Sequence, residues 1–133
     1  MLATDPGAER QMDLLEVFKD SDDLVELAAG AVLFEEGDHA DFMYVVVKGE
    51  ISLSLHGSEI ATVSPGSILG EMALVNSDAR SATATALTDC ALAPIDVHSF
   101  KLLIQHTPDF ALHIMTVLAD RLRRSNEALA DHT

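Results

Sequence analysis

Cysteine, basic residues and long apolar runs are all scarce in this chain, and each scarcity excludes a class of protein. Cys90 is the only cysteine among 133 residues, so no internal disulfide can form and the paired cysteines of zinc and redox sites are absent. The apolar runs, such as 42–47, fall far below the ~18 residues that a membrane-spanning helix requires. The first residues, MLATDPGAER, lack the basic and then apolar regions of a signal peptide. We therefore expect a soluble, cytoplasmic protein that does not contact a membrane.

Acidic residues outnumber basic ones 22 to 8, which gives a net charge of −14. A protein this negative repels the phosphate backbone that nucleic-acid-binding proteins must neutralise. The charge is uneven, because residues 1–50 alone carry a net charge of −10. We expect no nucleic-acid partner for this chain.

The length and composition are those of one folded domain. A single hydrophobic core can grow well past 133 residues before a chain divides. Hydrophobic residues make up 48% of the chain and charged residues 23%, which are globular rather than disordered proportions. We predict a single domain over residues 1–133.

Helical spacing marks the beginning of the chain. Met12, Leu15 and Phe18 recur at the spacing of one helix face, after a break at Pro6 and Gly7. The pattern predicts a short amphipathic N-terminal helix over about residues 8–19.

The middle of the chain, about residues 24–95, consists of short β-branched runs separated by glycine turns. Residues 42–47 are apolar enough for a strand buried on both faces. Residues 51–55 alternate between apolar and polar side chains, which predicts a strand with one face exposed to solvent. Residues 56–59 are typical of a hairpin turn. Seven or eight short strands favour a barrel or jelly roll, which limits exposed edges. The predicted fold class is mainly β with flanking α-helices.

Helical patterns return after the strands. Residues 97–106 form one segment, and Pro108 stands where the first turn of a second helix tolerates proline, so C-terminal helices are predicted over about residues 97–130. Five residues of the second helix are spaced by three and four, as in a coiled-coil seam: Met115, Leu118, Leu122, Ser125 and Leu129. This stripe either packs on the chain's own barrel or joins two copies in a parallel homodimer, and the sequence leaves both open.

The most informative chemistry lies in residues 69–74, LGEMAL, and 80–86, RSATATA. Arg80 is the only lysine or arginine between Lys48 and Lys101. Small neighbouring side chains allow a ligand to approach the backbone, and the planar guanidinium can bind two phosphate oxygens at once. Glu71, when ionised, only accepts hydrogen bonds and therefore suits a ligand hydroxyl. The pair predicts a ligand with an anionic group and a nearby hydroxyl. The alternative is a plain salt bridge from Arg80 to Glu71 or Asp78.

These two segments resemble the phosphate-binding cassette of the cyclic-nucleotide-binding domain family, whose pattern is an aliphatic residue, Gly-Glu, a small residue, and then Arg-Ser/Thr/Ala-Ala-Thr. A second motif of the family, a Gly-acid turn between strands, resembles Gly37-Asp38 with the strand 42–46 and Gly49 after it. The resemblance covers roughly residues 18–131. It implies a β-roll of the jelly-roll type, with the cyclic phosphate held by Arg80 and the ribose 2′-hydroxyl by Glu71. The ligand-binding residues it implies are Leu69, Gly70, Glu71, Met72, Ala73, Arg80, Ser81, Ala82, Ser125 and Asn126.

The same resemblance assigns the long C-terminal helix to contact with the base. In the catabolite-activator branch two adjacent polar residues of this helix reach the adenine, and Ser125 and Asn126 fall at the matching place. The alternative is that both are ordinary surface or seam positions. We expect cyclic AMP as the ligand, with cyclic GMP left open because the Ser81 hydroxyl could also pair with guanine. Ligand binding would then favour a state in which the helix closes over the base.

Two other functions remain to be weighed against a nucleotide sensor. A jelly roll can be a metal-dependent cupin enzyme, but the six histidines include no HxH pair and no HExxH motif, and Cys90 has no activating context. We therefore expect no metal, no cofactor and no enzyme activity. A scaffold that has lost its ligand is the stronger rival, although such a protein would have no chemical need for Glu71 and Arg80. The chain ends at Thr133 without a DNA-reading segment, so it is either a complete small sensor acting through an unknown effector protein or a fragment of a longer protein.

Overall fold

The computed structural model describes residues 14–74 and 79–131, with the side chains of Leu74 and residues 124–131 outside that description. The elements, in chain order, are α2 (Leu14–Phe18), β1 (Val25–Leu27), β2 (Val32–Phe34), β3 (Met43–Lys48), β4 (Ile51–Leu55), β5 (Ser58–Val63), β6 (Ile68–Leu69), the 3₁₀ helix η1 (Glu71–Leu74), β7 (Thr83–Ala86), β8 (Cys90–Ile95), α3 (Val97–His106) and α4 (Pro108–Asp131). The described residues divide into two compact units, a strand-bearing unit of residues 14–100 and a helical unit of residues 101–131. The prediction of a single domain over 1–133 stays a prediction.

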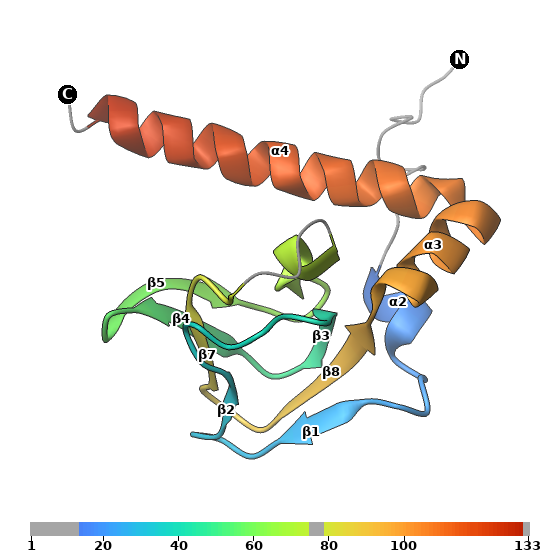
Figure 1. The fold of residues 1–133 in the computed structure, drawn as a ribbon, viewed down its shortest axis with the longest axis horizontal. Coiled ribbons are helices and arrows are strands. Elements are labelled where there is room, and N and C mark those ends of the chain that lie inside the picture. The colour runs from blue at the N-terminus through green and yellow to red at the C-terminus, as the bar shows by residue number, and fades with distance from the viewer. Residues whose placement is uncertain (1–13, 75–78, 132–133) are drawn as a thin grey trace, which may run out of the picture. The chain divides into compact units, whose positions relative to one another are not determined.

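The strands form two antiparallel sheets of four strands each (Figure 1). One sheet has the order β1-β8-β3-β6 and the other the order β2-β7-β4-β5. Strands far apart in the sequence are neighbours, since β2 pairs with β7 and β3 pairs with β8. This is the mainly β, jelly-roll type of fold that the sequence predicts.

One apolar cluster receives side chains from both sheets. Its buried members are Val46, Ile51, Val63, Leu69, Ala84, Ala86, Cys90 and Leu92. Several half-buried side chains pack against this cluster, among them Phe34 of β2 and Tyr44 of β3. The core therefore packs strands that come before the segment 69–82 in the sequence against strands that come after it.

The strand predicted to be buried on both faces is β3, in which Met43, Val45 and Val46 are fully buried. The prediction for 51–55 is only partly correct. Ser52 and Ser54 of β4 are half-buried rather than wet, because β4 lies between β5 and β7, where Thr62 and Thr85 oppose Ser52. The predicted turn after β4 is a two-residue hairpin in which His56 and Gly57 both have positive φ angles, 52° and 85°.

The helices begin at local signals. Asp96 caps α3, because its carboxylate accepts a hydrogen bond of 2.7 Å from the backbone N–H of Ser99. Pro108 opens α4, as predicted. The described part of the N-terminal helix is α2, and residues 8–13 of the prediction lie outside the described residues. None of the described helices combines the length and apolar character that a membrane crossing requires.

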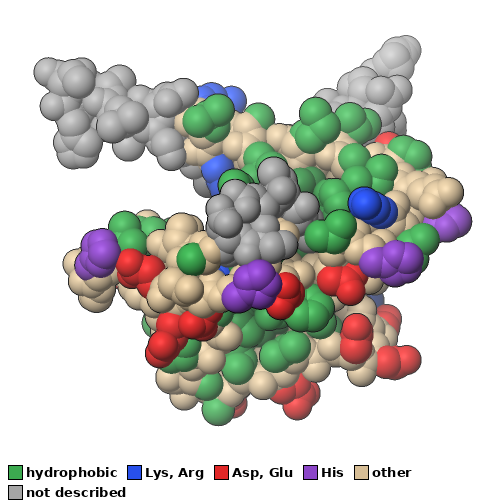
Figure 2. All heavy atoms as spheres, in the orientation of Figure 1, with side chains coloured by type: hydrophobic (Ala, Val, Ile, Leu, Met, Phe, Trp, Pro, Cys, Tyr) green, Lys and Arg blue, Asp and Glu red, His purple; other side chains and the backbone are tan. Residues whose placement is uncertain are grey.

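The surface of the strand-bearing unit is acidic. Figure 2 shows carboxylate side chains distributed over this unit on the visible face, in keeping with the negative charge of residues 1–50. On α4, Met115, Leu118 and Leu122 of the predicted seam are exposed, whereas the side chains of Ser125 and Leu129 lie outside the described residues. The homodimer through this helix stays a prediction.

Candidate functional site

The segment 69–74 makes a tight turn between a buried strand and a short 3₁₀ helix. Strand β6 ends at Leu69, Gly70 turns the chain with a φ of 73°, and η1 begins at Glu71. The backbone N–H of Ala73 donates to the carbonyl of Gly70 over 3.1 Å, which closes the first turn. Leu69 and Ala73 are buried, Glu71 is half-buried, and Met72 is 62% exposed. The turn thus buries Leu69 and Ala73 and leaves Glu71 partly accessible to solvent.

The second half of the site, Arg80, is held by the turn at Gly37. The backbone N–H of Arg80 donates to the carbonyl of Asp38 over 2.7 Å, and the N–H of Gly37 donates to the carbonyl of Arg80 over 2.9 Å. An isolated bridge between His39 and Ala79 extends this pairing. The two motifs recognised in the sequence are therefore joined by backbone hydrogen bonds, which sequence reasoning did not anticipate.

The Arg80 side chain reaches from this turn to the turn at Gly70. Nη1 donates to the carbonyl of Gly70 over 3.3 Å, and Nη2 donates to the carbonyl of Phe42 over 2.7 Å. Arg80 is only 8% exposed, and its Nε is buried without a hydrogen-bond partner in the part of the chain that the structure describes. Arginine carries five N–H donors, so a buried and unused Nε–H is an open position for an acceptor.

Two aromatic rings lie near the Arg80 guanidinium. The Cζ atom of Arg80 lies 4.1 Å from the ring centroid of Phe34 and 5.9 Å from that of Tyr44. Both separations fall within the range of a cation–π interaction. Sequence reasoning missed these two residues. A signal was available, since the chain has only six aromatic residues and three of them, at 34, 42 and 44, bracket the Gly37 turn.

Burial dominates the electrostatics of the site. Desolvation lowers the pKa of the Arg80 guanidinium from its ordinary value, and the nearby Tyr44, Asp41 and Asp38 oppose this shift. Desolvation likewise raises the pKa of Tyr44, opposed by the positive charge of Arg80. The cation is thus held in surroundings that weaken its hydration.

The alternative of a plain salt bridge can be examined for the described part of the chain. There, no carboxylate oxygen lies within ion-pair distance of Arg80, and Glu71 is not its partner. The other proposed partner, Asp78, lies outside the described residues. Arg80 is therefore compensated by two backbone carbonyls and two rings rather than by Glu71.

The remaining predicted residues divide into three groups. Gly70 and Arg80 are brought into contact, and Glu71 follows Gly70 directly. Ser81 is exposed and Ala82 is buried beside Arg80 in the chain. The side chains of Ser125 and Asn126 lie outside the described residues, so their assignment to the base stays a prediction.

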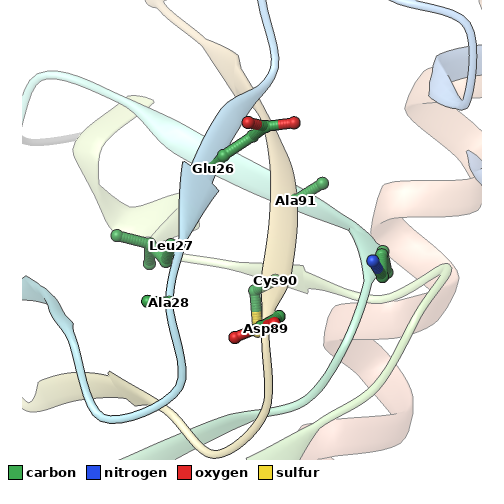
Figure 3. A pocket seen from close by; sticks show the side chains of 7 residues that line it. Glu26, Leu27, Ala28, Asp89, Cys90 and Ala91 are labelled. Atoms are coloured by element: carbon green, nitrogen blue, oxygen red, sulfur yellow. The ribbon is translucent and has the colours of Figure 1, made fainter.

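A pocket of about 330 Å³ lies elsewhere on the strand-bearing unit (Figure 3). It is lined by Glu26, Leu27, Ala28, Lys48, Asp89, Cys90 and Ala91. Two of its side chains are engaged by the backbone: Asp89 accepts from the Ala29 N–H, and the Cys90 thiol contacts the carbonyls of Glu50 and Thr88. None of the predicted ligand-binding residues lines this pocket.

Comparison with known proteins places the chain in a family. A model described as a cyclic nucleotide-binding domain matches residues 24–107. The CRP-like cAMP-activated global transcriptional regulator of Mycobacterium tuberculosis is 26% identical over 112 residues, covering 80% of this chain and 50% of that protein. The cAMP-dependent protein kinase regulatory subunit of Eremothecium gossypii is 35% identical over 78 residues, covering 59% of this chain and 17% of that protein.

The fold agrees with solved structures of such proteins. The crystal structure of the catabolite activator protein of Thermus thermophilus superposes with a TM-score of 0.72 at 29% identity, covering 80% of this chain and 53% of that one. The chain spans half or less of the length of the two curated relatives. The family model and the matching fold confirm the resemblance inferred from the sequence: the chain belongs to the cyclic nucleotide-binding domain family.

Proposed function

We propose that this chain is a regulatory sensor module that binds cyclic AMP, with Arg80 holding the cyclic phosphate and Glu71 the ribose 2′-hydroxyl. The observation that carries the proposal is the state of Arg80. Its guanidinium is buried, and among the described residues it has neither a carboxylate partner nor an acceptor for its Nε–H. A buried cation with an open donor is suited to an anion that supplies both charge and acceptor.

The neighbouring groups suit the rest of a cyclic nucleotide. Glu71 stands directly after Gly70, whose carbonyl accepts from Arg80, so a ligand on Arg80 comes near this carboxylate. A cyclic 3′,5′-phosphate leaves only the 2′-hydroxyl of the ribose free to donate to it. The Ser81 hydroxyl, exposed and without a hydrogen-bond partner among the described residues, can add a further donor to the phosphate.

The choice of cyclic AMP over cyclic GMP rests on the two curated relatives, whose names describe them as cAMP-activated and cAMP-dependent. Under this proposal Ser125 and Asn126 contact the adenine, and the ligand favours a state in which the C-terminal helix closes over the base. The chain would act without catalysis and without a cofactor, in the cytoplasm and not on nucleic acid. A homodimer formed through the C-terminal helix, or an effector protein, would receive the signal.

Isothermal titration of the purified chain with cyclic AMP, cyclic GMP and 5′-AMP tests the proposal. We expect saturable binding of cyclic AMP, weaker binding of cyclic GMP, and no comparable binding of 5′-AMP, because 5′-AMP lacks the cyclic phosphodiester. A melting temperature that rises with cyclic AMP concentration would support the same conclusion, since a ligand that binds only the folded state stabilises it. No heat and no change in melting temperature with any of the three would instead favour a ligand-free scaffold.

A further inference from the structure

Three aromatic side chains form a cluster next to Arg80. The rings of Phe34 and Tyr44 are stacked, with centroids 6.4 Å apart and an interplanar angle of 29°. The ring of Phe42 lies 6.3 Å from that of Tyr44 at 42°. Only Phe34 approaches the guanidinium closely, with 4.1 Å from Cζ to the ring centroid. This ring is therefore the principal side-chain surface against the Arg80 cation.

The contact with the Phe34 ring itself uses none of the guanidinium N–H donors. An aromatic ring attracts a cation through its negative face and offers no lone pair to an N–H donor, while the guanidinium group itself is planar. The N–H donors point outward within that plane. A carboxylate partner would accept those N–H groups and compete with an incoming anion. A ring beside the cation compensates part of the charge and occupies none of the donors.

The in-plane contacts show which donors remain. The carbonyls of Gly70 and Phe42 accept from Nη1 and Nη2, and Nε keeps no partner. With Cζ over the Phe34 ring and both terminal nitrogens held by hydrogen bonds, the guanidinium has little freedom to move. The Nε–H is therefore presented in a fixed direction.

We propose that Phe34 is a positioning residue for anion binding, whose ring fixes the plane of the Arg80 guanidinium so that the Nε–H is available to a phosphate oxygen. The inference rests on the proposed function and deepens it. It assigns a role in ligand affinity to a residue that need not itself touch the nucleotide.

The test must separate this role from packing, because Phe34 also packs against the apolar core. Phe34→Leu keeps an apolar side chain and removes the aromatic face, whereas Phe34→Tyr keeps the face. Leu33→Ala is the matched control, since Leu33 is the neighbouring residue of β2 and packs against the same core. Each variant is titrated with cyclic AMP in the calorimeter and melted without ligand.

We expect Phe34→Leu to weaken cyclic AMP binding by about 2- to 30-fold, the range that corresponds to losing a cation–π contact. Phe34→Tyr should bind within about twofold of the parent chain. Leu33→Ala should lower the melting temperature without changing affinity. In an Arg80→Gln background, where no cation remains to be positioned, Phe34→Leu should cost no further affinity.

Three results would overturn the inference: equal losses in Phe34→Leu and Phe34→Tyr, an equal loss in Leu33→Ala, or a loss that persists in the Arg80→Gln background. Unchanged affinity in Phe34→Leu, in a parent chain that binds cyclic AMP, would overturn it while leaving the proposed function intact. Failure of the parent chain to bind any cyclic nucleotide would overturn the proposed function, and the role of Phe34 with it.

Discussion

Gly70 and Arg80 lie so close together that a side chain at position 70 would require the Arg80 guanidinium to move. A Cβ atom there would lie 2.5 Å from Nη1 of Arg80, the nitrogen that donates to the Gly70 carbonyl. The φ angle of 73° at Gly70 is also one that other residues rarely adopt. Glycine at this position therefore permits both the turn and the observed position of the Arg80 guanidinium.

Gly70→Ala should reduce both stability and cyclic AMP affinity. The positive φ alone costs a residue with a Cβ about 1–2 kcal/mol, and the Cβ additionally displaces the guanidinium. Gly30→Ala is the control, because Gly30 has a φ of 89° but open space around its Cβ position. We expect chemical denaturation to show a loss of stability in both variants and calorimetry to show a loss of affinity only in Gly70→Ala. Equal affinity in the two variants would contradict the steric role.

Arg80→Gln should weaken cyclic AMP binding by roughly 10- to 150-fold. This range corresponds to the ~1.5–3 kcal/mol of a hydrogen bond to a charged group. Arg123→Gln provides a charge-matched control, since Arg123 is exposed on α4 and pairs with Asp120. Its affinity should match that of the parent chain. Titration calorimetry of both variants with cyclic AMP measures these affinities. An unaltered affinity in Arg80→Gln would mean that the phosphate binds elsewhere.

Glu71→Gln should weaken binding less than Glu71→Ala, because an amide oxygen still accepts a hydrogen bond from the ribose. The assignment to the 2′-hydroxyl can be measured by comparing cyclic AMP with its 2′-deoxy analogue. The parent chain should prefer cyclic AMP, and Glu71→Ala should lose that preference. If the variant discriminates between the two ligands as strongly as the parent, the hydroxyl is bound by another group.

Tyr44 should titrate above the ordinary tyrosine pKa in the folded protein. Burial raises its pKa from 10.0, so the folded state keeps the proton longer than the unfolded state. Its stabilising contribution is complete below about pH 10 and is lost as the pH rises through the folded-state pKa. Tyr44 is the only tyrosine and the chain has no tryptophan, so tyrosinate absorbance reports this group alone. A titration midpoint that does not fall on denaturation would contradict the expected shift.

The stabilising contribution of Asp96 should depend on pH in the opposite sense to that of Tyr44, and at acid pH. The hydrogen bonds from Ser99 lower the pKa of this carboxyl below 3.8, so its contribution is present above the unfolded-state pKa. That contribution is lost as the pH falls through the folded-state pKa. Asp96→Asn should retain much of the helix cap and remove this pH dependence, whereas Asp96→Ala should lose the cap. Denaturation curves of the three proteins below pH 5 measure the difference.

The local elements of the fold could be predicted because their signals are local. Helix α3 has the predicted bounds, and α4 begins at Pro108 as expected, since proline fits the first helical turn. Apolar runs, alternation and turn residues located β3, β4 and the hairpin after β4 for the same reason. The burial of Ser52 and Ser54 could not be predicted, because it depends on neighbours that β4 acquires only in the sheet.

In the candidate site, too, some features could be predicted from local sequence signals and others depended on the tertiary structure. Its charged members, Arg80 and Glu71, could be named from an isolated cation in an acidic chain and from the spacing of the cassette. The contacts of Phe34 and Tyr44 with Arg80 could not, because they join β2 and β3 to a residue that follows them by more than thirty positions.

By itself, the sequence determined the chemistry of this protein: which residues carry charge, where glycine permits a turn, and which segments become strands or helices. Those properties belong to single side chains and to short stretches of backbone. Only the tertiary structure decided that Arg80 would be compensated by an aromatic ring and two carbonyls instead of by Glu71. The physical reason is that the partner of a buried charge is whatever long-range strand pairing brings within a few ångströms, and no local pattern encodes that proximity.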